Sequence, residues 1–115
     1  MVGGGVRRGK VYWANLEPVI GSEQGGRRPV LVVQNDTGNR FAQHTIIAVI
    51  TSNTDVAGYP FGVGLPSEML GKPSAVNCSH VRTIDKRRLS GAPACMLDDA
   101  TMRRVDVALR VSLGL

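Results

Sequence analysis

The chain has 115 residues, a length that suits one domain with a single core and is too short for two. Hydrophobic residues make up 43% of it and charged residues 20%, which are globular values and exclude wholesale disorder. Fourteen basic residues against nine acidic ones give a net charge of +5, which favours an anionic partner such as a nucleic acid or an acidic protein segment.

The N-terminal residues MVGGGVRRGK are rich in glycine and basic, and no apolar stretch follows them. No secretion signal is therefore expected, and no window approaches the ~18 apolar residues of a membrane span. We expect residues 1–8 to form a flexible tail and residues 9–115 to form one domain of a cytoplasmic protein without membrane contact. Cys78 and Cys95 lie outside any metal-binding spacing, so we expect no disulfide framework, metal or cofactor.

The first strand is expected over residues 10–16, with Val11 and Trp13 on one face and Tyr12 and Ala14 on the other. Pro18 ends it, and a polar loop with glycines at positions 21, 25 and 26 follows.

The second strand is expected over residues 29–34, whose β-branched and apolar side chains suit a buried position. Pro29 has no N–H and restricts the preceding residue to extended geometry. Arg28 is therefore expected to be held at the entrance of this strand, where a site for an anion can be built. A surface loop with solvated arginines is the alternative.

The middle of the chain continues this pattern of short elements. Residues 35–39 read as a turn, residues 45–50 as a central strand, and the hydroxyls and amides of residues 51–54 as a polar strand end. Further expected elements are a short strand over residues 61–65, a helical turn over 66–71 closed by glycine, a strand over 74–82, a turn over 85–88 and a short segment over 89–94.

From Asp98 the period of the hydrophobic pattern becomes helical. Asp98 is a plausible N-cap, and Met102, Val105, Leu109 and either Ser112 or Leu113 fall on one face. Many short strands followed by one helix predict a mainly β fold, a small and strongly bent antiparallel sheet or barrel with an amphipathic C-terminal helix over one opening.

The sequence lacks the motifs of several well-known classes of enzyme. The glycines at 21, 25 and 26 precede a strand and lack the Gly-Lys-Ser/Thr of a phosphate-binding loop, and GxSxG and HExxH are both absent. His44 and His80 are the candidates for acid and base in a metal-free ribonuclease, but each is more simply explained as a surface or partly satisfied histidine.

A series of short motifs in fixed order resembles the MazF (PemK-like) toxins of bacterial toxin–antitoxin pairs. The matching residues are Arg8-Gly9, Val11-Tyr12, GSEQGG at 21–26, RPVLV at 28–32, QND at 34–36, NRF at 39–41, Ile50-Thr51, and RTIDK at 82–86 with Arg88-Leu89. Together they extend from about Arg8 to the final helix. The resemblance implies an SH3-like β-barrel that forms a homodimer.

The resemblance also implies a function. These toxins are metal-independent, sequence-specific endoribonucleases that cut single-stranded RNA, chiefly mRNA, and they are inhibited by a cognate MazE-like antitoxin whose disordered segment occupies the RNA groove. An antitoxin for this chain is expected to be acidic, which would complement the +5 charge.

By this resemblance Arg28 and Thr51 are the catalytic residues. The 2′-hydroxyl of the RNA attacks the neighbouring phosphate and gives a 2′,3′-cyclic phosphate and a 5′-hydroxyl. A guanidinium is permanently charged and its planar fork suits phosphate oxygens, so electrostatic stabilisation is the expected role of Arg28. Thr51 would orient the phosphate or the attacking hydroxyl.

Further residues are expected at the RNA. Glu23 and Gln24 lie in the glycine loop, where they can hydrogen-bond the edges of unstacked bases. Trp13 is expected in the core or at a dimer contact and not as a stacking platform. The other expected RNA contacts are Arg27, Asn35, Ser52, His80, Arg82 and Lys86.

Two other functions stay open. The related CcdB toxins have this fold and poison DNA gyrase, without nuclease activity, although such a poison has no use for the pair Arg28 and Thr51. A non-catalytic RNA-binding barrel would explain the basic charge equally well.

Overall fold

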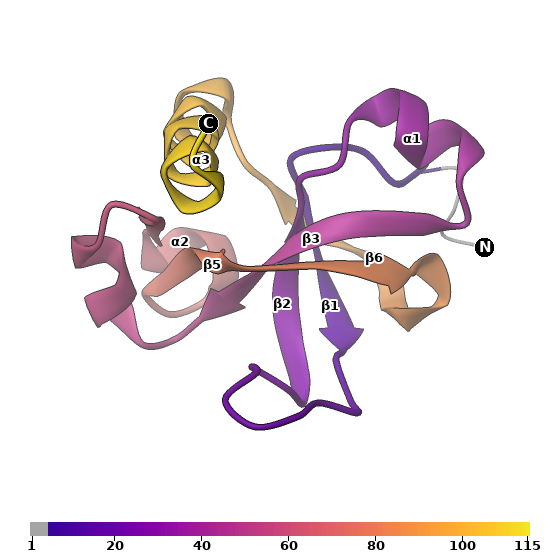
Figure 1. Cartoon of the computed structure of the whole chain (residues 1–115), viewed down its shortest axis with the longest axis horizontal. Coiled ribbons are helices and arrows are strands. Elements are labelled where there is room, and N and C mark those ends of the chain that lie inside the picture. Colours follow the sequence, from indigo (N-terminus) through magenta and orange to yellow (C-terminus); the bar gives the residue numbers. More distant parts are fainter. Residues whose placement is uncertain (1–4) are drawn as a thin grey trace.

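The computed structural model of the protein describes residues 5–115 (Figure 1). Its strands are β1 (Lys10–Asn15), β2 (Arg27–Val32), β3 (His44–Thr51), β4 (Gly62–Leu65), β5 (Ser74–Asp85) and β6 (Leu89–Met96). Its helices are α1 (Asp36–Phe41), α2 (Ser67–Leu70) and α3 (Asp99–Leu113), with the 3₁₀ helices η2 (Thr54–Gly58) and η3 (Lys86–Arg88).

The strands form one antiparallel six-stranded sheet in the order β4-β5-β3-β2-β1-β6. The predicted mainly β fold with a C-terminal helix is confirmed. The sheet is strongly bent (Figure 1), but it does not close into a barrel, because the outer strands β4 and β6 do not pair with each other.

Each face of the bent sheet carries a hydrophobic core. The predicted alternation of β1 is confirmed, since Val11 belongs to one cluster and Tyr12 and Ala14 to the other. The first cluster includes Leu31, Ala48, Ile50 and Val76 and is covered by Val105 and Ala108 of α3. The second includes Leu16, Val30, Val32, Ile47, Val49 and Ile84. Burial on both faces explains the nearly continuous apolar runs of β2 and β3.

Helix α3 begins as predicted, with the Asp98 carboxylate accepting a hydrogen bond of 2.7 Å from the Thr101 N–H. It packs on β4 and β5 (Figure 1). The predicted apolar face is correct for Met102, Val105 and Leu109, which pack against the core, but wrong for Leu113, whose exposure is 57%. The last turn of the helix extends beyond the sheet that it covers.

The expected turn at residues 35–39 and the expected start of the second strand were wrong. Residues 35–39 form the start of α1 and not a turn, because the Asn35 side chain caps the helix by accepting the Gly38 N–H at 2.8 Å. The second strand begins two residues earlier than expected, so that Arg27 and Arg28 belong to β2 itself. Gly38 inside α1 and the charges at the start of β2 hid these elements in the sequence.

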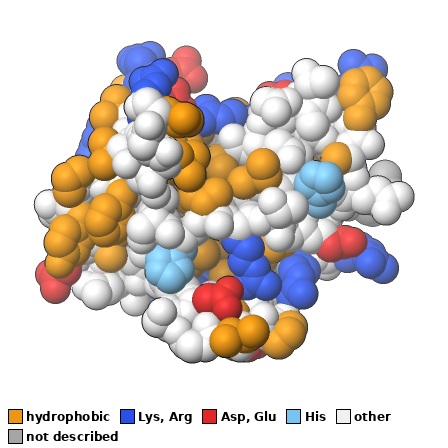
Figure 2. Space-filling model, in the orientation of Figure 1, with side chains coloured by type: hydrophobic (Ala, Val, Ile, Leu, Met, Phe, Trp, Pro, Cys, Tyr) orange, Lys and Arg blue, Asp and Glu red, His pale blue; other side chains and the backbone are white. Residues whose placement is uncertain are grey.

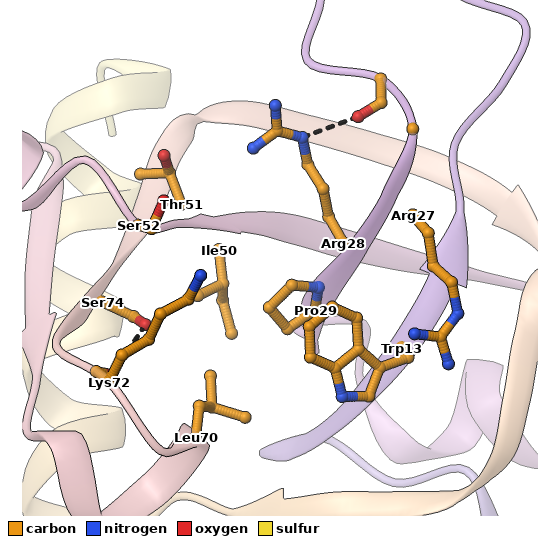
Figure 3. A pocket seen from close by; sticks show the side chains of 12 residues that line it. Trp13, Arg27, Arg28, Pro29, Ile50, Thr51, Ser52, Leu70, Lys72 and Ser74 are labelled. Carbon is orange, nitrogen blue, oxygen red and sulfur yellow. Dashed lines mark hydrogen bonds between the residues drawn. The ribbon is translucent and has the colours of Figure 1, made fainter.

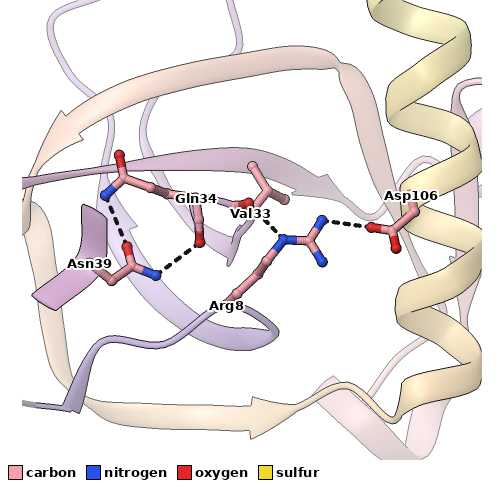
Figure 4. A network of polar contacts seen from close by, with 5 residues as sticks. All are labelled: Arg8, Val33, Gln34, Asn39 and Asp106. Carbon is pink, nitrogen blue, oxygen red and sulfur yellow. Dashed lines mark hydrogen bonds and ion pairs between the residues drawn. The ribbon is translucent and has the colours of Figure 1, made fainter. Parts of the chain in front are cut away.

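Part of the expected tail, residues 5–8, makes contacts with the rest of the domain. Residues 1–4 lie outside the described residues, but Val6 is buried in the second core. The Arg8 guanidinium pairs with Asp106 of α3 at 2.6 Å and donates to the Val33 carbonyl at 2.8 Å (Figure 4). Residues 5–8 are therefore packed on the domain. The division of the chain into a tail and one domain stays a prediction.

Asn39 is the centre of a buried polar network beside β2 (Figure 4). Its amide nitrogen donates to the Gln34 carbonyl at 2.9 Å, and its amide oxygen accepts from the Gln34 amide at 3.1 Å and from the Thr45 hydroxyl at 2.7 Å. A buried network in which every polar atom has a partner fixes the position of the short helix α1.

We expect Asn39→Ala to lower the free energy of unfolding by about 2–4 kcal/mol, because Thr45 and the Gln34 carbonyl lose buried partners. Urea unfolding followed by circular dichroism measures this. Gln43→Ala, which truncates an exposed amide nearby, should change stability by less than about 0.5 kcal/mol. Equal effects of the two substitutions would contradict a special role for Asn39.

Asp36 should make stability depend on pH. The backbone N–H of Arg8, donating at 2.7 Å, and the side-chain amide of Asn39 lower the pKa of this carboxyl. Since the folded-state pKa lies below the unfolded one, the stabilisation is present above about pH 4 and is lost as pH falls through the folded pKa. Asp36→Asn should therefore flatten the fall in unfolding free energy below about pH 4, measured by urea unfolding at several pH values, whereas Thr37→Ala, at an exposed neighbour without a charge, should leave the slope unchanged.

Candidate functional site

A pocket of about 350 Å³ opens where β2 begins and β3 ends (Figure 3). It is lined by Trp13, Gly25, Gly26, Arg27, Arg28, Pro29, Ile50, Thr51, Ser52, Leu70, Lys72 and Ser74. Four of the residues predicted to act on RNA, namely Arg27, Arg28, Thr51 and Ser52, are therefore brought together.

The register of β2 and β3 places Arg28 beside Thr51. Val30 lies opposite Val49, and the same register continued by two residues brings Arg28 opposite Thr51. The pairing ends at Val30 and Val49, and Arg28 and Thr51 follow on the same face of the two strands, where both line the pocket. In Figure 3 the guanidinium and the hydroxyl lie at the same end of the pocket.

The Arg28 guanidinium is oriented by the glycine loop. Its Nε donates to the Gly25 carbonyl at 2.7 Å (Figure 3). This bond uses one edge of the planar fork and fixes the plane of the group. The two terminal nitrogens remain for an anion, in a geometry that suits two oxygens of one phosphate.

The Thr51 hydroxyl is available as a donor. Thr51 is 6% exposed, and its Oγ1 accepts a hydrogen bond of 3.1 Å from the Asn53 N–H. Because the oxygen already accepts at that side, the hydroxyl hydrogen is free to donate to an oxygen placed in the pocket.

The base of the glycine loop is held closed by several hydrogen bonds. The Leu16 N–H donates to the Gly26 carbonyl at 2.9 Å, and the Gly26 N–H donates to the Glu17 carboxylate at 2.7 Å. Arg82 donates to the Leu16 carbonyl at 2.8 Å and Arg88 donates to the Glu17 carbonyl. These contacts position the loop that in turn holds Arg28.

Glu23 and Gln24 lie within this loop and are both held by hydrogen bonds. The Glu23 carboxylate accepts the Ile20 N–H at 2.9 Å, which leaves this exposed residue part of a local turn. The Gln24 side-chain oxygen accepts from the Asn77 amide of β5 at 3.2 Å. The loop is therefore tied to β5 at its tip and to β1 at its base.

His80 lies in an irregular part of β5, outside the pocket. Val49 pairs with Asn77 whereas the preceding residue, Ala48, pairs with Val81, so residues 78–80 bulge from the ladder. His80 is half-buried there. Arg82 lies beyond this bulge, and in the structure its side chain supports the loop base.

Asn35 and Lys86 lie at the other end of the sheet. Asn35 follows β2 at the end away from Arg28 and caps α1, and Lys86 donates to the Asn39 carbonyl beside that helix. His44, also at that end, pairs with Asp85. The structure brings none of these three to the pocket.

The pocket also contains residues that sequence reasoning missed. Lys72 and Ser74 line it, and so does Trp13, which was expected in the core or at a dimer contact. Ser74 precedes Ala75, the β5 partner of Thr51, so its place follows from strand pairing. Lys72, in the turn between α2 and β5, carried no signal in the sequence.

The charge of the pocket is positive. Arg27, Arg28 and Lys72 line it, and no carboxylate does so in the described part of the chain. Within residues 5–115, no three side chains of His, Cys, Asp or Glu gather as a possible metal site. Burial raises the pKa of the Cys78 thiol to about 11, so this thiol is protonated at neutral pH and does not serve as a nucleophile. The arrangement suits an anion with several acceptor oxygens.

The helices of residues 5–115 include none that is both long enough and apolar enough to cross a membrane.

Comparison with known proteins shows a family to which most of the chain is similar. Residues 7–113 match the family described as PemK-like, MazF-like toxin of type II toxin-antitoxin system. The endoribonuclease EndoA of Bacillus subtilis is 48% identical over 112 residues, which cover 96% of each chain.

Solved structures of the same kind are also similar. The crystal structure of MazF from Deinococcus radiodurans is 31% identical, covers 96% of this chain and 97% of its own, and has a TM-score of 0.82. An endoribonuclease in complex with its cognate antitoxin from Mycobacterial species is 29% identical, covers 96% of each chain and has a TM-score of 0.79.

A substitution at Gly25 tests whether the hydrogen bonds at its base hold the glycine loop in place. An added Cβ there would approach Val19 Cγ2 to 2.6 Å and the Glu17 carboxylate to 2.8 Å, so Gly25→Ala should displace Glu17 from the Gly26 N–H. Loss of this bond, worth about 1 kcal/mol, should speed amide exchange of Gly26 roughly fivefold. Gly58→Ala is the matched control, because a Cβ there meets nothing within 4 Å. Unchanged exchange at Gly26 in the first variant would contradict the proposed constraint.

Proposed function

The chain belongs to the PemK-like, MazF-like toxins of type II toxin–antitoxin systems, and we propose that it cuts RNA with Arg28 and Thr51 as its catalytic residues. The activity is that of a toxin endoribonuclease. The single observation that supports the assignment of the residues is their arrangement, a fixed guanidinium and a free hydroxyl donor on neighbouring strands that line one basic pocket.

The proposed reaction is the one that the family implies. The 2′-oxygen of the substrate loses its proton to water and bonds to the adjacent phosphorus, while the bond to the 5′-oxygen breaks and that oxygen takes a proton from water, which leaves a 2′,3′-cyclic phosphate and a 5′-hydroxyl. Negative charge grows on the phosphate oxygens in the transition state. The two terminal nitrogens of Arg28 donate to these oxygens, and the Thr51 hydroxyl holds one of them in place.

The substrate is single-stranded RNA, and mRNA is the target through which translation and growth are inhibited. An unpaired strand exposes its base edges, which the polar residues of the glycine loop and of β5 can bind. Glu23, Gln24 and His80 are the residues that we assign to recognition of the sequence. Because the charged groups of the pocket can stabilise the transition state themselves, we propose that cleavage needs no metal ion.

The partner of this toxin is a cognate antitoxin, which we expect to be acidic because the chain carries +5. We propose that the toxin is a cytoplasmic homodimer. The apolar residues Val107, Val111 and Leu113 of α3, which are more than half exposed in the single chain, support an interface of this kind. The gyrase poison and the non-catalytic barrel leave the pairing of Arg28 with Thr51 unexplained.

We expect Arg28→Ala to reduce cleavage of a long single-stranded RNA at least a hundredfold in excess chelator, because the transition state loses its fixed positive charge. Thr51→Val, which keeps the shape and removes the hydroxyl, should reduce it about tenfold or more. Gel mapping of the cuts, with analysis of the cyclic-phosphate ends, measures both effects.

The control for this experiment is Arg103→Ala, which removes an exposed arginine of α3 outside the pocket and should cleave like the wild type. Circular dichroism shows whether each variant is folded. Wild-type activity in folded Arg28→Ala would refute the assignment of this residue, and cleavage that stops in chelator would refute metal independence.

A further inference from the structure

One half of the pocket is not used by the proposed reaction. Arg28 and Thr51 lie at one end, whereas the other part is walled by Trp13 and has Pro29, Ile50 and Leu70 as apolar neighbours (Figure 3). Phosphate oxygens gain nothing from such a surface. A ligand that fills the whole pocket must therefore have a flat or apolar group close to its anionic one.

The ring of Trp13 is held in position. Trp13 pairs with Pro29 of β2 on one side and with Ser90 of β6 on the other, so its backbone is part of the sheet. The Arg27 guanidinium lies over the ring at 4.9 Å from its centroid. In Figure 3, Arg27 and Lys72 lie on opposite sides of Trp13, and the pocket lies between Trp13 and Lys72.

The charge around Trp13 indicates which kind of ligand binds in this part of the pocket. Its edges carry Arg27 and Lys72 in addition to Arg28, and no carboxylate lines the pocket among the described residues. A neutral apolar side chain would not use these cations. A nucleotide has both required parts, because its base offers a flat π-surface and its phosphates offer charge. A volume of about 350 Å³ is within the range of small-molecule sites.

We propose that Trp13, with Arg27 and Lys72, forms a nucleobase subsite that stacks the unpaired base next to the scissile phosphate. The inference rests on the proposed function for the identity of the strand. Arg27 holds the indole from one side, the base stacks on the ring from the pocket, and Lys72 contacts the phosphate of the same nucleotide. Stacking on Trp13 places the base and so positions the adjacent phosphate at Arg28.

Trp13 is the only tryptophan of the chain, so its fluorescence reports on the subsite directly. The probes are octanucleotides of mixed sequence with 2′-O-methyl groups throughout, which cannot be cut because the attacking hydroxyl is blocked. A matched octamer without bases has the same backbone charge. The first should quench the emission of the wild-type protein and the second should not, at the same ionic strength.

Variants separate stacking from a structural role. Trp13→Ala should weaken binding of the base-containing octamer about tenfold or more, while Trp13→Phe, which keeps an aromatic ring, should stay within about threefold of the wild type. Binding of the abasic octamer should be equal in all three. Phe41→Ala is the matched control, because Phe41 also lies beneath an arginine, Arg40, but outside the pocket.

Several results would overturn the subsite. These are unchanged binding in Trp13→Ala, equal quenching by the abasic octamer, or emission that shifts with protein concentration alone, which would mean that a second copy covers the ring. If Trp13→Ala does not fold, the subsite is tested by quenching of the wild-type protein and by binding of the octamers to Trp13→Phe. Normal RNA cleavage together with any of these results would refute the subsite and support the nuclease function. Base-dependent quenching without RNA cleavage would support the subsite and refute the nuclease function.

Discussion

The pairing of β2 with β3 is the interaction on which the site depends. A shift of one residue in this register would turn Arg28 to the other face of the sheet and separate it from Thr51. The register is fixed by burial, because Val30 and Val49 lie opposite each other within the second core. The packing that stabilises the sheet is therefore the same packing that assembles the site.

Several cations of this protein have structural partners, so the net charge of +5 does not by itself locate the site at which an anion binds. Arg8 pairs with Asp106 and Arg87 pairs with Asp85. Arg82 and Arg88 support the base of the glycine loop through carbonyl groups. The cations that face the pocket are few, and they gain their effect from being close together beside a surface that contains no carboxylate among the described residues.

The sequence predicted the features that depend on neighbouring residues and missed those that depend on contacts between distant elements. Local patterns identified the central strands, the helix after Asp98 and the strand entrance that holds Arg28. The position of Lys72 depends on how α2 meets β5, a tertiary relation without local pattern. Asn35 shows the opposite case, because the motif that contains it resembles the family whereas its side chain caps α1 at the end of β2 away from Arg28, so that its contact with RNA stays a prediction.

The two halves of the pocket separate two tasks that a sequence-specific nuclease has to perform. Charge stabilisation on the side of Arg28 and Thr51 is indifferent to the base, since every phosphate of the strand is alike. Stacking on the side of Trp13 needs a base, whichever base it is, and adds nothing to charge stabilisation. Because both sides belong to one pocket, a base stacked on Trp13 can hold the adjacent phosphate at Arg28 without any change in the proposed catalytic residues. Substitutions around Trp13 should therefore alter how tightly the strand is held, while the register of β2 and β3 preserves how it is cut.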